Sequence, residues 1–211
     1  MNDRRIAVLV SNKGTGSILK SLIEAGFDIR LVAADTDDAK GVKIAKESNI
    51  PFEILPYSPV PESSKEDYRN EYSLKLAELL NARNANIAVL AGFNRILTKP
   101  YFENFGGVTI NSHPGAIPDT KNEPYRFEDG TIAPWNQGMM TDKAVANFLP
   151  LKFATSTIHI VTEEADLGPI LKRVIVPVDV GDTVESLYPR LKKEEQQGLI
   201  EVLNNPSLRS Q

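Results

Sequence analysis

Two polar side chains, Asn111 and His113, follow the short apolar run at residues 108–110. We expect that run to be a buried strand of an open α/β sheet, in which chemistry lies just beyond the carboxyl ends of the strands. Because the two residues are two positions apart, an extended backbone points their side chains to the same side. An amide that can donate to an oxyanion, beside an imidazole that can carry protons, suits acyl transfer. The alternative interpretation is a polar turn that ends a strand.

Composition and charge exclude several classes of protein. The chain has 211 residues, a net charge of −4 and no long basic cluster, so no nucleic-acid or membrane partner is expected. Cysteine is absent, which excludes disulfides, thiolate catalysis and cysteine metal sites. The two histidines fall on separate predicted strands and form no recognisable metal site. The apolar run near the N-terminus is too short for a signal sequence or a membrane span, so a cytoplasmic protein is expected.

Alternating apolar runs and helical patterns predict an α/β fold, a Rossmann-like, mostly parallel sheet flanked by helices. The length fits one domain over residues 1–203, with a loose tail at 204–211. Strands are expected at residues 6–10, 28–34, 51–55, 87–91, 108–110, 155–162 (with one wetter face) and 170–178. Helices are expected from about 17 to a C-cap at Gly26, at 39–48, 66–82 and 139–149, and from a capping turn at 181–183 to about 202. Loops are expected at 56–64 and, as a long stretch, at 119–137.

Three strand ends carry residues that could bind a ligand. The glycine turn at residues 11–17 offers the amides of Gly16 and Ser17 to a phosphate, although a plain turn is equally consistent. Leu19 replaces the third glycine of the dinucleotide fingerprint, so we interpret Asp35 as a turn and cap residue rather than a ribose ligand. Arg95 could contact a ligand or be a solvated charge. The strand ends share one edge of the sheet, which favours a functional role for Asn111 and His113.

Three motifs in order, at residues 90–97, 110–114 and 161–169, make the chain resemble the phosphoribosylglycinamide formyltransferase (glycinamide ribonucleotide transformylase) family of purine biosynthesis. The resemblance implies a Rossmann-like α/β fold with an antiparallel C-terminal part. It also implies that the protein is a monomer or a homodimer. It also implies 10-formyltetrahydrofolate as formyl donor, with no metal, and the amine of glycinamide ribonucleotide as acceptor.

The resemblance also implies roles for single residues. Asn111 would donate to the oxyanion, His113 would carry the proton, and Asp166 would stabilise the charged imidazolium. The ribonucleotide would contact Gly16, Ser17, Ile18, Lys192 and Glu195. The folate would contact Arg69, Asn94, Arg95, Ile96, Leu97, Asn111, Thr162, Glu163, Glu164, Ala165 and Asp166. His159, on a strand outside this set, is interpreted as structural.

The chain departs from the family at three places and leaves two alternatives open. Ile18 stands where asparagine is usual, Lys13 lies in an enlarged phosphate loop, and residues 119–137 are inserted before a segment that lacks the usual histidine. The inserted residues allow a second hypothesis, in which the acceptor is another amine, such as an amino sugar nucleotide. A third hypothesis is a non-catalytic, nucleotide-binding Rossmann domain.

Overall fold

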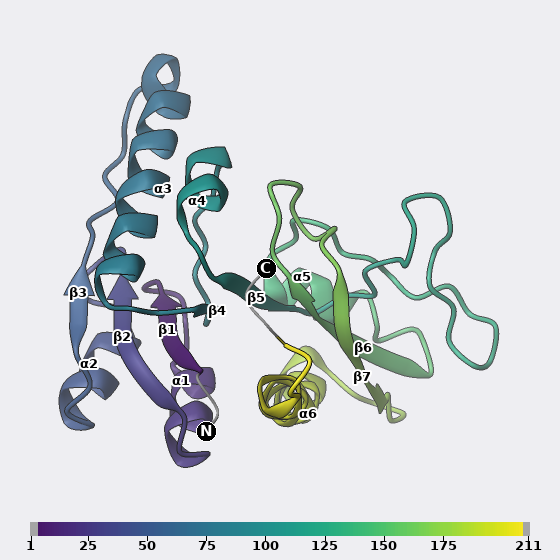
Figure 1. Cartoon of the computed structure of the whole chain (residues 1–211). Helices are drawn as coiled ribbons and strands as arrows, with labels where there is room; N and C mark the ends of the chain where they lie inside the picture. Colours follow the sequence, from purple (N-terminus) through teal and green to yellow (C-terminus); the bar gives the residue numbers. More distant parts are fainter. Residues whose placement is uncertain (1–3, 209–211) are drawn as a thin grey trace. The chain divides into compact units, whose positions relative to one another are not determined.

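The apolar runs in the first half of the chain form parallel strands in the computed structural model, which describes residues 4–208. The strands are β1 (Arg5–Val10), β2 (Asp28–Ala34), β3 (Phe52–Ile54) and β4 (Ile87–Leu90), in the order β3-β2-β1-β4 (Figure 1). Pairs β1–β2, β1–β4 and β2–β3 are parallel. Ile6, Ala7, Val8 and Leu9 are fully buried, as expected for a strand covered on both faces. The predicted strands are confirmed, with β3 shorter than expected.

The helices of this part match the predictions with three corrections. They are α1 (Ser17–Glu24), α2 (Lys40–Glu47), the short 3-10 helix η1 (Glu62–Ser64), α3 (Lys65–Ala82) and α4 (Lys99–Asn104). Gly26 has φ +75°, the left-handed conformation of a residue that ends a helix. The turn at residues 35–38 does not cap α2, whose N-cap is Ala39 without a side-chain hydrogen bond. Neither α4 nor η1 was predicted, because both are short and lack a clear apolar period.

The described residues fall into two compact units, residues 4–110 and 111–208. Strand β5 (Val108–His113) starts in the first unit and ends in the second, which continues with β6 (Phe153–Ile160) and β7 (Ile170–Pro177) in the order β5-β6-β7. Strands β6 and β7 are antiparallel, as expected of the C-terminal part. The strand predicted to end at residue 110 therefore continues through His113. The single domain at 1–203 stays a prediction, and residues 209–211 of the expected tail lie outside the described part.

The wetter face predicted for β6 is wrong, because all of its hydroxyl residues are buried. Thr155, Ser156 and Thr157 are each 0% exposed. Thr155 donates to Val174 O over 2.8 Å, and Thr157 donates to Gly115 O over 2.6 Å. Internal acceptors replace water, so these polar side chains can be buried without a large desolvation penalty.

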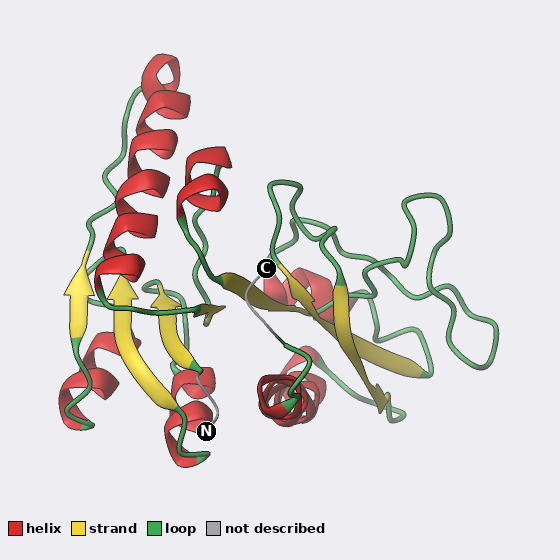
Figure 2. Ribbon diagram, in the orientation of Figure 1, coloured by secondary structure: helices red, strands yellow, loops and turns green. Residues whose placement is uncertain are grey.

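The inserted stretch, residues 119–137, contains isolated bridges but no helix or strand, as predicted (Figure 2). An aromatic cluster packs this stretch against the rest of the second unit. Phe127 is 3% exposed, and its ring lies 6.0 Å from that of Tyr125 and 5.6 Å from that of Phe153. The guanidinium of Arg173 lies 4.4 Å from the Tyr125 ring centre and donates to Ile117 O. The stretch is therefore a packed loop with apolar contacts of its own.

Two helices complete the second unit, α5 (Thr141–Ala146) and α6 (Val184–Asn204). The predicted cap of α6 is confirmed: Thr183 and Ser186 form a reciprocal capping box. Asp182, just before it, accepts hydrogen bonds from Arg190, Ser186 and the Asp179 amide. No helix within residues 4–208 is both long and apolar enough to cross a membrane.

Asp182 should make stability depend on pH. Hydrogen bonds from Arg190, then Ser186 and the Asp179 amide, lower the pKa of Asp182. A lowered folded-state pKa means that the carboxylate stabilises the fold above the unfolded value of about 3.9, and that this contribution is lost as the pH falls through the folded-state pKa. We expect Asp182→Asn to unfold at a lower temperature than the parent at pH 7, with a clearly smaller gap at pH 2. An equal gap at both pH values, measured by thermal unfolding, would contradict this assignment.

Candidate active site

Asn111, His113, His159 and Asp166 form one cluster in the second unit. Asn111 and His113, both on β5, contact different members of this cluster. His113 Nδ1 lies 3.5 Å from Asp166 Oδ2, and Asn111 Nδ2 lies 3.5 Å from His159 Nε2. His159 Nε2 is in turn 3.8 Å from Asp166 Oδ1. The structure thus brings together the three residues that the resemblance implied to be catalytic.

His159 belongs to this cluster, although the sequence indicated only a structural histidine. Its side chain is 1% exposed, and its Nδ1 donates to Ile160 O over 3.0 Å, which leaves Nε2 as an acceptor facing Asn111. Burial lowers the pKa of His159, although Asp166 opposes this shift. A neutral His159 can accept a hydrogen from the Asn111 amide and so orient it. The only signal in the sequence for this contact was that His159 lies on β6, the next predicted strand after β5.

Asp166 has an unusual backbone conformation, with φ +53°. Few residues other than glycine adopt this left-handed region, so the surrounding contacts must hold it. Gly138 N donates to Asp166 Oδ2 over 2.9 Å, and Trp135 Nε1 donates to Asp166 O over 3.0 Å. At Gly168, a Cβ would lie 1.7 Å from Ile160 O, so only glycine fits there. The loop therefore delivers the Asp166 carboxylate to both histidines.

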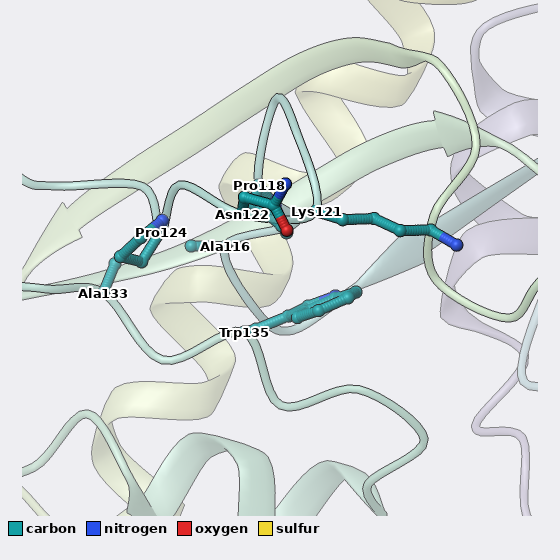
Figure 3. Close-up of a pocket in the computed structure, with 7 residues that line it drawn as sticks. All are labelled: Ala116, Pro118, Lys121, Asn122, Pro124, Ala133 and Trp135. Carbon is teal, nitrogen blue, oxygen red and sulfur yellow. The ribbon is translucent and has the colours of Figure 1, made fainter.

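The second nitrogen of His113 contacts the inserted stretch. His113 Nε2 lies 2.7 Å from Trp135 O, a carbonyl that can only accept. Both ring nitrogens of His113 thus face acceptors, and the imidazolium is the form that donates from both. The Trp135 ring also lines a cavity of about 110 Å³ (Figure 3). The other lining residues are Ala116, Pro118, Lys121, Asn122, Pro124 and Ala133.

Lys192 and Glu195, predicted ribonucleotide contacts, form a buried ion pair on α6. The Glu195 side chain is 3% exposed, and its carboxylate pairs with Lys192 Nζ. Ser112 Oγ donates to Glu195 Oε1 over 2.7 Å, and Ser156 Oγ lies 2.9 Å from Glu195 Oε2. Burial lowers the pKa of Lys192. The Glu195 carboxylate, Tyr188 and the hydrogen bond to Glu195 together raise it by more, so the net shift of the pKa is upward. The Lys192 ammonium is therefore charged at neutral pH.

The phosphate turn lies in the first unit, and its three predicted residues differ in accessibility. Gly16 is the N-cap of α1 at φ +77°, and no side chain caps the helix. Ser17 is half-buried, whereas Ile18 is 4% exposed, with its side chain in the core. Backbone amides and the Ser17 hydroxyl are thus the groups that could meet an anion, and the Ile18 side chain is not.

Asp35 links the glycine turn to the loop that follows β4. Ser11 Oγ and Arg95 Nε donate to Asp35 Oδ2 over 2.8 and 2.5 Å, and the carboxylate side chain is 0% exposed. The Asn94 amide donates to Ser11 Oγ over 3.3 Å, and the Arg95 guanidinium lies 4.4 Å from the Tyr57 ring centre. Arg95 is therefore a paired, stacked side chain. The interpretation of Asp35 as a cap residue is wrong, because its carboxylate is used by Ser11 and Arg95.

Removing the Asp35 charge should weaken the first unit. We expect Asp35→Asn to lower the free energy of unfolding by about 1–3 kcal/mol. The substitution removes the charged hydrogen bond between Arg95 and the buried carboxylate, whereas Ser11 can still donate to the amide oxygen of asparagine. Urea denaturation measures this change. The exposed Arg83–Glu53 pair of the same unit is the matched control, and Glu53→Gln should cost at most about 1 kcal/mol. Equal effects of the two substitutions would rule out a special role for Asp35.

The other predicted folate contacts lie on both units. Arg69 is half-buried on α3, Ile96 is 57% exposed, and Leu97 is buried. On the second unit, Thr162 Oγ1 donates to Glu164 O, and the Glu164 carboxylate pairs with Lys121 over 2.5 Å. Of the predicted contacts at residues 162–166, the exposed ones are Glu163, Glu164 and Ala165. Within residues 4–208, no group of three or more His, Asp or Glu side chains is placed to hold a metal ion.

Comparison with known proteins identifies the family. A family model described as formyl transferase matches residues 4–203. A phosphoribosylglycinamide formyltransferase of Mycobacterium tuberculosis is 30% identical over 200 residues, which cover 93% of this chain and 81% of that protein. The chain belongs to the phosphoribosylglycinamide formyltransferase family. The human trifunctional purine biosynthetic protein adenosine-3 is also similar, at 29% identity over 90% of this chain and 17% of its own length.

Solved structures of the family have the same fold. Glycinamide ribonucleotide transformylase 1 from Symbiobacterium toebii superposes with a TM-score of 0.75 at 27% identity, covering 95% of this chain and 85% of that one. The phosphoribosylglycinamide formyltransferase of Streptococcus pneumoniae gives a TM-score of 0.74 at 23% identity over 95% of this chain. The predicted α/β fold, parallel in its first part and antiparallel at its C-terminal end, is therefore confirmed.

Three contacts of the cluster could not be derived from the sequence. Trp135, Gly138 and Gly115 each approach His113 or Asp166 closely. Trp135 and Gly138 lie in or next to the inserted stretch, where no periodicity indicates a direction for any side chain. For Gly115, the only signal was its position directly after the His113-Pro114 dipeptide.

Proposed function

We propose that this chain transfers the formyl group of 10-formyltetrahydrofolate to the amine of glycinamide ribonucleotide, a step of purine biosynthesis. The observation that carries the proposal is the cluster of Asn111, His113 and Asp166 in a chain of this family. An amide donor, an imidazole and a supporting carboxylate are the groups that acyl transfer to an amine requires.

The reaction joins the amine nitrogen to the formyl carbon and later breaks the bond from that carbon to N10 of the folate. Between these events the formyl oxygen carries negative charge, and the amine must lose a proton while N10 gains one. Asn111 is assigned the oxyanion, because its amide can donate to the oxygen while His159 accepts its other hydrogen. This arrangement favours charge that develops only in the transition state.

His113 and Asp166 are assigned the proton and the charge. With one ring nitrogen facing the Asp166 carboxylate, a positive imidazolium is stabilised next to the developing oxyanion. Proton transfer from amine to N10 passes through this region, with His113 as carrier once its Nε2–H turns from the Trp135 carbonyl to the substrate. Gly16, Ser17, Lys192 and Glu195 are assigned to the ribonucleotide, and the strip from Asn94 to Leu97 with residues 162–166 to the folate.

A two-substrate assay tests the proposal. A 10-formyl folate analogue that absorbs on deformylation is mixed with glycinamide ribonucleotide, and the wild-type enzyme is run beside His113→Ala. We expect turnover that requires both substrates and is lost in the variant. Absence of turnover with glycinamide ribonucleotide in the folded wild-type protein would contradict the acceptor assignment.

The inserted stretch supports a second candidate acceptor. Trp135 from this stretch touches both His113 and Asp166, so it could shape the space for the acceptor. An amino sugar nucleotide in place of glycinamide ribonucleotide, in the same assay, separates the two candidates. Turnover with the amino sugar nucleotide alone would favour the second one, with the formyl donor unchanged.

A further inference from the structure

We propose that Trp135 is a positioning residue for formyl transfer, whose carbonyl and indole hold the His113 ring and the Asp166 loop in place before the substrates bind. This inference rests on the proposed function, because it takes His113 and Asp166 as the acting pair. We call the two bonds together the Trp135 clamp: His113 Nε2 to Trp135 O, 2.7 Å, and Trp135 Nε1 to Asp166 O, 3.0 Å.

The space for the clamp exists because residue 115 is glycine. A Cβ at Gly115 would lie 2.0 Å from Trp135 O and 2.6 Å from His113 Nε2. Both separations are far below van der Waals contact, and one involves backbone, which cannot swing aside as a side-chain end can. Any side chain at position 115 would therefore displace the Trp135 carbonyl from the His113 ring.

The residues beside Trp135 keep its backbone in place. Ala116 N donates to Pro134 O over 2.9 Å. Asn136 is 7% exposed, and its Nδ2 lies 2.9 Å from Pro114 O and 3.0 Å from Ala144 O. Hydrogen bonds on both sides of Trp135 thus fix the inserted stretch to the segment that directly follows His113. A carbonyl held in this way presents a fixed acceptor to His113.

The indole bond of the clamp restrains the Asp166 loop. Asp166 is in the left-handed conformation at φ +53°, which is unfavourable for a residue other than glycine and must be held by its contacts. The indole fixes its carbonyl, Gly138 N fixes its carboxylate, and Gln137 Nε2 donates to Ala165 O over 2.8 Å. All three donors lie close together in sequence, at positions 135, 137 and 138, at or just after the end of the inserted stretch.

Two substitutions separate the two bonds of the clamp. Trp135→Phe removes the indole donor but keeps a ring and the main-chain carbonyl, and Gly115→Ala disturbs the carbonyl. We expect kcat to fall about 5- to 10-fold for Trp135→Phe, the value of one hydrogen bond, and by at least ~10-fold for Gly115→Ala. KM should stay within about twofold for both substrates, because the clamp acts on the reacting groups rather than on binding.

Two matched controls make comparable changes at positions outside the clamp. Tyr125→Phe deletes a hydroxyl from an aromatic ring of the same inserted stretch, and that hydroxyl forms no hydrogen bond with the described residues. Gly106→Ala adds a methyl group at a glycine with nothing within 4 Å of the added atom. Both controls should keep wild-type kcat and KM.

A structural readout independent of activity uses the single tryptophan of the chain. Its indole N–H gives one signal in a nitrogen-15 NMR spectrum. We expect that signal to exchange slowly with water in the wild type, and to shift and exchange faster in Gly115→Ala but not in Gly106→Ala. Because the signal requires no substrate, it tests the clamp even if glycinamide ribonucleotide is not the acceptor.

The outcomes are distinct for the clamp and for the proposed function. Loss of kcat in Trp135→Phe and Gly115→Ala, with KM unchanged and the indole signal moved in Gly115→Ala, supports the clamp. Wild-type kcat in both variants, while Asp166→Asn is inactive, overturns the clamp and leaves the function intact. A rise in KM without loss of kcat assigns Trp135 to substrate binding and also overturns it. If the wild type does not formylate glycinamide ribonucleotide, the proposed function is rejected. If the indole signal is unchanged in Gly115→Ala, the clamp is rejected, whatever the acceptor is.

Discussion

Asp166→Asn should lower kcat by about 10²–10⁴-fold while the protein stays folded. Asparagine tolerates the left-handed conformation that residue 166 adopts at φ +53°. Its carbonyl oxygen can still accept from Gly138 N, so the loop keeps its main anchor. What disappears is the negative charge, 3.5 Å from His113 Nδ1. The loss of rate would therefore report loss of the charge that stabilises the imidazolium.

Steady-state kinetics and ribonucleotide binding measure this prediction. KM for the ribonucleotide should stay close to the wild-type value, and far-ultraviolet circular dichroism should be unchanged. Glu128→Gln, at an exposed carboxylate in the inserted stretch, is the charge-matched control and should be fully active. A kcat for Asp166→Asn within about threefold of wild type would remove Asp166 from the mechanism.

Glu195→Ala should cause the largest loss of stability, about 3–5 kcal/mol in the free energy of unfolding. The substitution leaves Lys192 without its carboxylate, and the hydroxyls of Ser112 and Ser156 lose an acceptor. The Glu195 carboxylate is 3% exposed, so water cannot replace it without rearrangement of α6. An uncompensated charge in such a place is far more costly than a missing surface pair.

The same helix carries the control for this prediction. Glu201 pairs with Lys172, but its side chain is 49% exposed, so Glu201→Ala should leave the urea midpoint nearly unchanged. Urea denaturation of both variants decides the matter. A midpoint for Glu195→Ala equal to that of Glu201→Ala would show that the buried pair does not stabilise the second unit.

The sequence predicted the fold well because its signals were local. Continuous apolar runs predicted β1, β2 and β4, and the Gly181-Asp182-Thr183 turn predicted the start of α6. Errors arose where tertiary contacts replaced water. The hydroxyls of β6 resemble a solvated face, but acceptors on Val174, Gly115 and Glu195 allow them to be buried. No property of the segment itself contains that information.

For the candidate site, spacing along one strand could be derived but partners across the fold could not. Asn111 and His113 follow from a two-residue period on β5, and Asp166 came from the resemblance rather than from the pattern. Asp35 was misinterpreted because its partner Arg95 is 60 residues away in sequence. Trp135 lay in a stretch without periodicity, so its two bonds to His113 and Asp166 were visible only in three dimensions.

A single-turnover experiment with a carbon-13 formyl group would follow the transferred carbon from donor to acceptor. Enzyme in excess is mixed with labelled 10-formyltetrahydrofolate and glycinamide ribonucleotide, and the products are identified by mass spectrometry. We expect the label on the ribonucleotide amine with the wild type and on the folate with His113→Ala. Label on the ribonucleotide at the same rate in both proteins would contradict the assigned site. Label left on the folate, or released as formate, in the wild type would contradict the reaction itself.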